Sequence, residues 1–225
     1  MKEKKTLLDK VSHVVTLAGT VILMNLMFLI ASLPIVTIGP AWCGLLSSIR
    51  YNIRGDGWFS GFKAGFCTRF WRSLIIWCVC LPLCLFFLND LNQALINNDI
   101  AYCIASGIFF ALAGMLTTAL LTLNVYIPTS VSNWLKNSVN FFRHPLPLLA
   151  AAALFWAPLI LALLVDMLIF LQIIMIFVAA YFALAAVCAT MLLKNPLIDF
   201  LLDARADGTL TAEEGSAPRT ADAEE

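Results

Sequence analysis

The sequence predicts an all-α fold: a polytopic membrane helix bundle with five to six membrane segments and a Pro/Gly hairpin turn after the first. Composition is the first reason, because only 12% of the 225 residues are charged and 61% are hydrophobic. Soluble domains carry about 25% charged residues, so this chain lacks the polar side chains to cover a water-soluble globule. The second reason is a series of long uncharged runs, and the third is a one-sided distribution of cations between them.

The N-terminal segment MKEKKTLLDK precedes an uncharged run of 36 residues, from Val14 to Ile49. A secretory signal has an apolar region of about 7–15 residues that ends at a small-residue cleavage site. This run is far longer, and no such site follows it at that distance. We therefore expect the first helix to be retained as a signal anchor.

The stretch SLPIVTIGP, residues 32–40, predicts a turn inside this run. As one helix the run would extend about 54 Å, well beyond a hydrocarbon core of roughly 30 Å. Pro34 and Pro40 lack a backbone donor, Gly39 can adopt backbone angles closed to other residues, and the Thr37 hydroxyl can satisfy freed backbone groups. The returning arm, residues 41–53, is only about 20 Å long as a helix, so it is either a short span or a re-entrant segment.

Four further uncharged runs predict the remaining spans, at residues 73–89, 100–126, 145–165 and 167–193. A helix needs about 20 residues to cross the hydrocarbon core, and 17 can suffice. Residues 126–144 are more polar and predict a loop with an amphipathic helix. Asp166 separates the last two runs and is expected at the outer connection.

The 14 cations decide between five and six segments. With a hairpin in the first run, all of them fall on one side of the membrane, and the positive-inside rule makes that side cytoplasmic. With five simple crossings, the N-terminal cations and those of residues 50–72 would lie on opposite sides. We therefore expect a multi-pass protein of the cell membrane with both termini in the cytoplasm. The cations are Lys2, Lys4, Lys5, Lys10, Arg50, Arg54, Lys63, Arg69, Arg72, Lys136, Arg143, Lys194, Arg205 and Arg219.

The C-terminal residues differ in composition from the rest of the chain. The last 27 residues contain eight acidic and two basic side chains and are rich in Ala, Gly and Thr. Such a segment cannot bury an apolar core. We expect a membrane domain over residues 1–203 and a disordered acidic cytoplasmic tail over residues 204–225.

The segment GWFSGFKAGFCTRFWRS, residues 57–73, predicts an amphipathic helix. At 100° per residue its phenylalanines form a stripe less than 90° wide, flanked or opposed by cations. One interpretation is a face directed at the cytoplasmic membrane interface or at a partner. The other is an extension of the following span that packs on its neighbours. The candidate face consists of Phe59, Phe62, Lys63, Phe66, Arg69 and Arg72, with Phe70 at the end of the stripe.

Polar side chains within the apolar runs are candidates for intramembrane contacts, because burying them is costly. Asn25 lies near the middle of the first run, and Thr117 and Asn124 lie in the run at residues 100–126. Hydrogen bonding between helices is the favoured role, and a path for a solute is the alternative.

No motif for catalysis or cofactor binding is present. The sequence has no phosphate-binding glycine loop, no zinc-ligand cluster and no G-x-S-x-G. Its seven cysteines include Cys78, Cys80 and Cys84, but no histidine or carboxylate lies near them in sequence, and free cysteine packs as a small hydrophobe. We expect no enzyme activity, no metal, no cofactor and no nucleic-acid partner.

Residues 25–77 resemble the YesL family of small bacterial membrane proteins. The similarity rests on an Asn in the first span, the turn P-x-x-T-x-G-P (Pro34, Thr37, Gly39, Pro40), and a basic stretch leading to F-x-x-F-K-x-x-F. The order of spans over residues 10–200 also fits, and the acidic tail lies outside the resemblance. No catalytic residue is implied, since the family has no established activity.

The resemblance implies an accessory role beside carbohydrate uptake, because members of the family are associated with ABC-type sugar importers in Gram-positive bacteria. The expected partners are then the lipid bilayer and the permease subunits of such an importer, or another membrane protein. The alternative function is a stand-alone small-solute transporter or permease, with a path lined by Asn25, Thr117 and Asn124.

Overall fold

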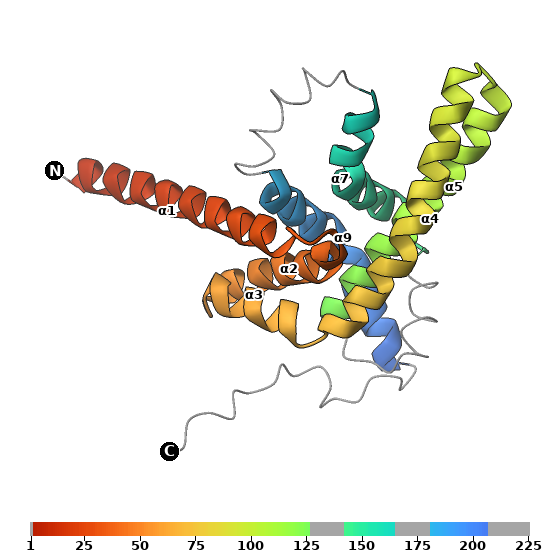
Figure 1. The fold of residues 1–225 in the computed structure, drawn as a ribbon. Helices are drawn as coiled ribbons and strands as arrows, with labels where there is room; N and C mark the ends of the chain where they lie inside the picture. The colour runs from red at the N-terminus through yellow and green to blue at the C-terminus, as the bar shows by residue number, and fades with distance from the viewer. Residues whose placement is uncertain (1, 127–141, 165–180, 207–225) are drawn as a thin grey trace.

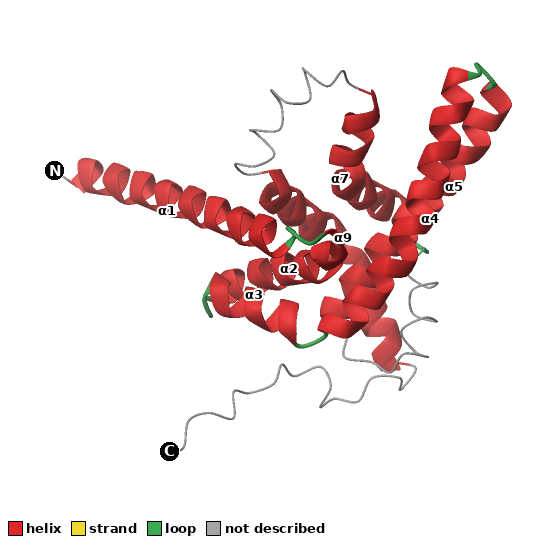
Figure 2. Cartoon of the chain, viewed as in Figure 1, coloured by secondary structure: helices red, strands yellow, loops and turns green. Residues whose placement is uncertain are grey.

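The computed structural model describes residues 2–126, 142–164 and 181–206, and over these residues every regular element is helical (Figures 1 and 2). This confirms the predicted all-α fold. The elements are α1 (Lys2–Ala31), a short 3-10 helix η1 (Ile35–Thr37), α2 (Ile38–Arg54), α3 (Trp58–Cys67), α4 (Phe70–Ile96), α5 (Ile100–Tyr126), α7 (Pro145–Leu164) and α9 (Phe182–Ala206).

The long N-terminal run is interrupted at the expected place. Helix α1 ends at Ala31, η1 follows, and α2 begins at Ile38. The rings of Phe28 and Trp42, one on each side of this break, meet edge to face with centroids 6.2 Å apart. The chain therefore folds back on itself, while the N-terminal part of α1 extends away from the other helices (Figure 1).

Helix α2 lies at the centre of the molecule. All eleven residues from Gly39 to Ile49 are buried, so no face of this part of the helix is left open. A helix that is apolar and buried on every side is a core helix, in contrast to one with a single buried stripe. Protein therefore covers residues 39–49 of α2 all round, which is the condition under which a short or re-entrant segment is tolerated in lipid.

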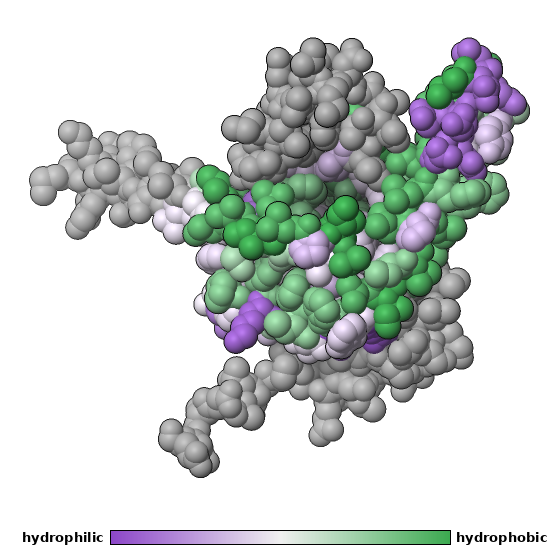
Figure 3. Space-filling model, in the orientation of Figure 1, coloured by the Kyte–Doolittle hydropathy of each residue, from purple (hydrophilic) through white to green (hydrophobic). Residues whose placement is uncertain are grey.

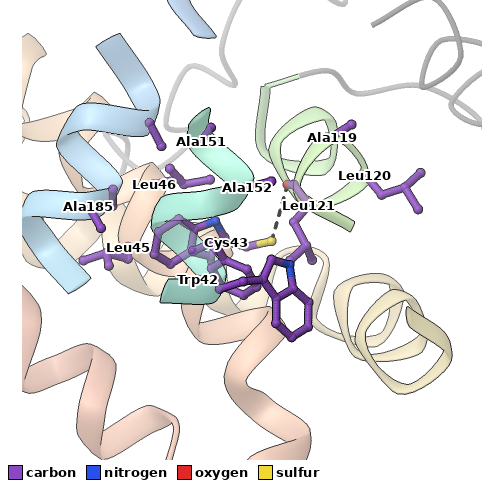
Figure 4. Close-up of a cluster of buried hydrophobic side chains, with 14 of the residues drawn as sticks. Trp42, Cys43, Leu45, Leu46, Ala119, Leu120, Leu121, Ala151, Ala152 and Ala185 are labelled. Atoms are coloured by element: carbon purple, nitrogen blue, oxygen red, sulfur yellow. Dashed lines mark hydrogen bonds between the residues drawn. The ribbon is translucent and has the colours of Figure 1, made fainter. Parts of the chain in front are cut away.

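Buried alanines on the surrounding helices belong to the same core cluster as α2. Figure 4 shows Trp42, Leu45 and Leu46 of α2 in one cluster of buried side chains with alanines of α5, α7 and α9. Small residues let helix backbones approach closely, which is a common way of packing helices where lipid replaces water. The alanines are Ala119, Ala151, Ala152 and Ala185, all of them buried.

Helices α4 and α5 form a hairpin. Each has 27 residues and is long and apolar enough to cross a membrane, and α5 coincides with the predicted span at residues 100–126. The hairpin projects beyond the other helices, and its tip, around residues 89–99, is hydrophilic (Figures 1 and 3). At the tip Asn98 is left-handed, and Asp99 Oδ1 accepts a hydrogen bond from the Tyr102 N–H, which caps the start of α5.

Two predicted boundaries differ from the observed ones. Residues 57–73 do not form one helix, because α3 ends at Cys67 and α4 starts at Phe70. Arg69 at this break has φ −133° and ψ 36°, outside the helical region. Helix α9 continues to Ala206, past the expected boundary at residue 203. Residues 207–225, residues 127–141 and Asp166 lie outside the described residues.

Candidate functional site

The Thr37 hydroxyl closes the turn between α1 and α2. Its oxygen lies 2.6 Å from the Ala31 carbonyl oxygen and 2.7 Å from that of Pro34. The Ala31 carbonyl is one of the last four of α1, which have no partner within a helix that ends there. The one hydroxyl proton can therefore be donated either to the Ala31 carbonyl, freed at the end of α1, or to the Pro34 carbonyl in the turn.

Pro34 and Pro40 stand at positions that suit a residue without an N–H. Pro34 is extended (φ −76°, ψ 120°) and directly precedes η1. Pro40 is the third residue of α2, in the first turn, where backbone N–H groups have no partner within the helix. Both prolines thus end one element or begin the next without the loss of a hydrogen bond.

Gly39 has a different role from the one expected. It lies inside α2 and is absent from the residues with positive φ, so it does not supply unusual backbone angles. A Cβ at this position would lie 2.5 Å from Cβ of Trp77 and 3.0 Å from the carbonyl oxygen of Ser73. Gly39 is therefore needed because α4 passes too close for any side chain.

Trp77 joins α4 to the turn. Its indole Nε1–H donates a hydrogen bond of 2.8 Å to the Ile35 carbonyl oxygen in η1. The same indole stacks on Trp156 of α7, with centroids 5.8 Å apart. The turn motif, α4 and α7 are thus fixed relative to one another by one side chain.

A polar cluster lies where α2 meets the end of α5. Arg69 Nη1 donates a 2.7 Å hydrogen bond to the Asn124 carbonyl oxygen, near the C-terminal end of α5. A cation at this end is favoured by the helix dipole and by the carbonyls left open there. Cys43 Sγ lies 3.6 Å from the Leu121 carbonyl oxygen and 4.0 Å from Asn124 Nδ2. Burial lowers the pKa of Arg69, but a guanidinium stays charged in proteins.

Arg50 belongs to the same end of the molecule. Its guanidinium carbon lies 5.6 Å from the centroid of the Tyr126 ring, at the last residue of α5. This is a cation–π contact. Arg50 and Arg69 therefore both contact the C-terminal end of α5, one at the Tyr126 ring and the other at the Asn124 carbonyl.

The predicted amphipathic face is only partly a surface. Phe62 is 4% exposed and packs against α2, where its ring would touch a Cβ placed on Gly44. Phe66 is half-buried and stacks on Phe62 with centroids 5.9 Å apart. For these two residues the second interpretation, packing on neighbouring side chains, fits better than an outward face, and Phe62 lies in the contact of α3 with α2. Phe59 and Lys63 are exposed, and Arg69 is half-buried.

Sequence reasoning missed two glycines in α3. A Cβ on Gly61 would lie 2.6 Å from Cβ of Tyr51, and one on Gly65 would collide with Cβ of Ser47 and lie 2.6 Å from the Cys43 carbonyl oxygen. The spacing G-x-x-x-G at residues 61–65 is a known signal for close helix packing in membranes and could have revealed this contact.

The three candidate intramembrane polar residues take part in different contacts. Asn25 Oδ1 accepts a 3.1 Å hydrogen bond from the Ala183 N–H near the start of α9. Thr117 donates to the Ala113 carbonyl oxygen at 2.8 Å and lies 3.7 Å from Cys84 Sγ of α4. Asn124 contacts Cys43 as described above. These contacts join α1 to α9, α4 to α5, and α2 to α5.

Among the described residues, no three His, Cys, Asp or Glu side chains are grouped so that they could hold a metal ion. Cys43 and Cys84 are buried in the helix contacts given above, while Cys67 is exposed at the end of α3.

The apolar helices α4 and α5 and a family match together indicate a helical membrane protein. A family model described as "Protein of unknown function, DUF624" matches residues 21–91, from the second half of α1 through the turn, α2 and α3 and most of α4. YesL is a DUF624 family of small bacterial membrane proteins, so the resemblance seen in the residues is confirmed. No curated protein and no solved structure matches the chain.

Proposed function

We propose that the protein is a multi-pass protein of the cell membrane with six membrane segments and both termini in the cytoplasm. The cations support this arrangement, since a hairpin in the first run places all 14 on one side. The surface supports it as well. Figure 3 shows hydrophilic surface at the tip of the α4–α5 hairpin and near the α2–α3 hairpin at the opposite end, with hydrophobic surface between them.

Labelling of single cysteines tests this topology. In a background whose exposed native cysteines are replaced by alanine, Asp56→Cys reports the α2–α3 connection and Leu95→Cys the tip of the α4–α5 hairpin. We expect a membrane-impermeant maleimide, added to intact cells, to react at position 95 and to reach position 56 only after the membrane is opened. Reaction of both positions in intact cells would contradict the arrangement.

We propose further that the protein acts by binding another membrane protein, as an accessory or interaction subunit without catalytic activity. One observation carries this: Asn25, Thr117 and Asn124 are each used in contacts that hold helices together. A solute path needs polar groups directed at the solute. The contacts of these three residues favour helix packing over the alternative of a stand-alone transporter.

The partner that the resemblance suggests is a permease subunit of an ABC-type sugar importer. The described helices offer a membrane-embedded surface for such a partner, since the α4–α5 hairpin exposes large apolar side chains along its length. These include Val79, Phe86, Ile104 and Ile108. Lipid or another membrane protein must cover them, because contiguous apolar surface of this kind is not left in water.

Site-specific photo-crosslinking in native membranes tests the proposal. A crosslinking amino acid at Phe86 or Ile108 should yield an adduct with a permease subunit, while the same amino acid at Leu121, which is fully buried, should not. Purification in mild detergent and identification of the attached chain gives the readout. Adducts with lipid alone from the exposed positions, together with solute uptake by vesicles that contain only this chain, would overturn the proposal in favour of a transporter.

A further inference from the structure

A second surface, which we name the basic corner, comprises residues 50–73 at the α2–α3 hairpin and the start of α4. Its sequence contains five cations, Arg50, Arg54, Lys63, Arg69 and Arg72, and one carboxylate, Asp56. This part of the molecule therefore carries a net charge of about +4.

Four of the five cations of the basic corner divide into two groups, and the fifth, Arg72, is half-buried. Arg50 is stacked on Tyr126 and Arg69 is bonded to the Asn124 carbonyl, so both serve the end of α5. Arg54 and Lys63 are exposed on the α2–α3 hairpin. Neither is needed for a contact described above, which leaves their charges directed at the surroundings of the molecule.

Large apolar side chains are also exposed in the basic corner. Ile53 is 75% exposed, Phe59 is 55% exposed and Trp71 is 74% exposed. Trp71 follows the break at Arg69, where α4 enters its apolar part. Aromatic residues and cations that alternate at the end of an apolar helix are typical of the level of the lipid headgroups, where rings reach toward the acyl chains and cations toward phosphates.

We propose that the basic corner binds the headgroups of anionic phospholipids. Charge complementarity argues for this ligand, because two exposed cations in one corner with the exposed apolar side chains of Ile53, Phe59 and Trp71 match a phosphate above an apolar layer. The α2–α3 hairpin is itself rigid, since Gly61 and Gly65 lie directly against α2. Arg54 and Lys63 are therefore held on a rigid helix hairpin. The inference rests on the proposed topology, which puts this corner at the cytoplasmic leaflet.

Lipid binding can be measured on the full chain in neutral detergent. Native mass spectrometry during titration with phosphatidylglycerol, and separately with phosphatidylcholine, counts the lipids bound. We expect the wild type to prefer phosphatidylglycerol and to lose that preference as salt is raised. In Arg54→Gln/Lys63→Gln the affinity for phosphatidylglycerol should fall about 30-fold, since each surface cation contributes roughly a factor of five. Binding of phosphatidylcholine should not change.

The matched control removes two cations elsewhere. Lys194→Gln/Arg219→Gln has the same net charge as the corner variant and should keep the wild-type affinity. An equal loss in both variants, or no preference of the wild type between the two lipids, overturns the proposal and leaves the corner as a face for a protein partner. Because the assay uses purified protein, its result does not depend on the sidedness measured by cysteine labelling or on the partner found by crosslinking.

Discussion

A methyl group at position 39 would lie 2.5 Å from Cβ of Trp77 and 3.0 Å from the carbonyl oxygen of Ser73. Neither neighbour is the free end of a flexible side chain, so α2 and α4 must move apart to admit it. We expect Gly39→Ala to lower the free energy of unfolding by about 1–3 kcal/mol. Unfolding in mild detergent, followed by circular dichroism, measures this.

Gly19→Ala is the matched control for this substitution. Gly19 lies in α1, and a Cβ there would meet nothing within 4 Å. Alanine should be neutral or should stabilise by up to about 1 kcal/mol, because glycine disfavours a helix interior. Equal stability of Gly39→Ala and Gly19→Ala would show that the contact with Trp77 can relax.

At the residue scale, the sequence indicates a role when the role is local. That Thr37 can bond freed carbonyls follows from its place beside prolines and a helix end, and its hydroxyl does lie beside the Ala31 and Pro34 carbonyls. Gly39 was expected to provide unusual backbone angles, and that expectation was wrong. Its real constraint comes from Trp77, 38 positions further along the chain, and no local pattern contains that contact.

The contact of α3 with α2 gives a prediction at the scale of the element. In Gly65→Ala the added Cβ would lie 2.6 Å from the Cys43 carbonyl oxygen, a backbone atom that cannot turn away. The two helices should separate, at a cost of about 1–3 kcal/mol in unfolding free energy. Faster hydrogen exchange over residues 58–67 would show the separation directly.

Gly107→Ala in α5 is the control, since its nearest neighbour, Leu91 Cδ1, would be 3.9 Å away at ordinary contact distance. This variant should keep wild-type stability and exchange. Wild-type exchange of α3 in Gly65→Ala would instead mean that the helices do not depend on their close approach.

Two phenylalanines of α3 differ in burial, so substituting each of them distinguishes a packing role from a surface position. Phe62→Ala empties a buried site between α3 and α2 and should cost about 3–5 kcal/mol of stability, with a lower level of protein in the membrane. Phe59→Ala removes an exposed ring and should change stability by less than about 0.5 kcal/mol. Thermal unfolding of the two variants side by side gives the comparison, and similar losses would contradict the packing described for Phe62.

Hydropathy predicted elements well where the uncharged run and the helix coincide, as for α5. It did not predict the break between α3 and α4. The amphipathic pattern of residues 57–73 continues through that break, and the chain leaves the helix at Arg69, whose guanidinium reaches the end of α5. A long-range hydrogen bond thus accompanies a boundary that periodicity alone does not show.

For the whole molecule, sequence reasoning gave the helical class and the fold-back after the first helix, but not the arrangement around α2. A lipid-facing helix and a helix buried in protein are both apolar, so hydropathy cannot distinguish them. The buried alanines on α5, α7 and α9 belong to the same core cluster as α2, and this becomes visible only when the helices are placed together (Figure 4).

The fold-back itself gives the last prediction. Replacing Pro34, Gly39 and Pro40 together with leucine removes both prolines and puts a side chain at position 39, where Trp77 leaves no room for one. The replacement also favours one continuous helix through the turn. Such a helix could cross the membrane only once without large mismatch, whose cost grows with every ångström. The cations from Arg50 to Arg72 would then be directed outward, against the positive-inside bias.

We therefore expect the triple variant to insert wrongly or to be degraded, with single replacements milder. Its level in the membrane and the maleimide accessibility of Asp56→Cys in the same chain measure both outcomes. Val36→Leu is a control that adds leucine at an exposed position of the turn and keeps the prolines, the glycine and the Thr37 hydroxyl, and it should preserve sidedness. A normal level and unchanged sidedness of the triple variant would show that the bend is imposed by the packing of α2 among its neighbours, and that the turn residues only accommodate it.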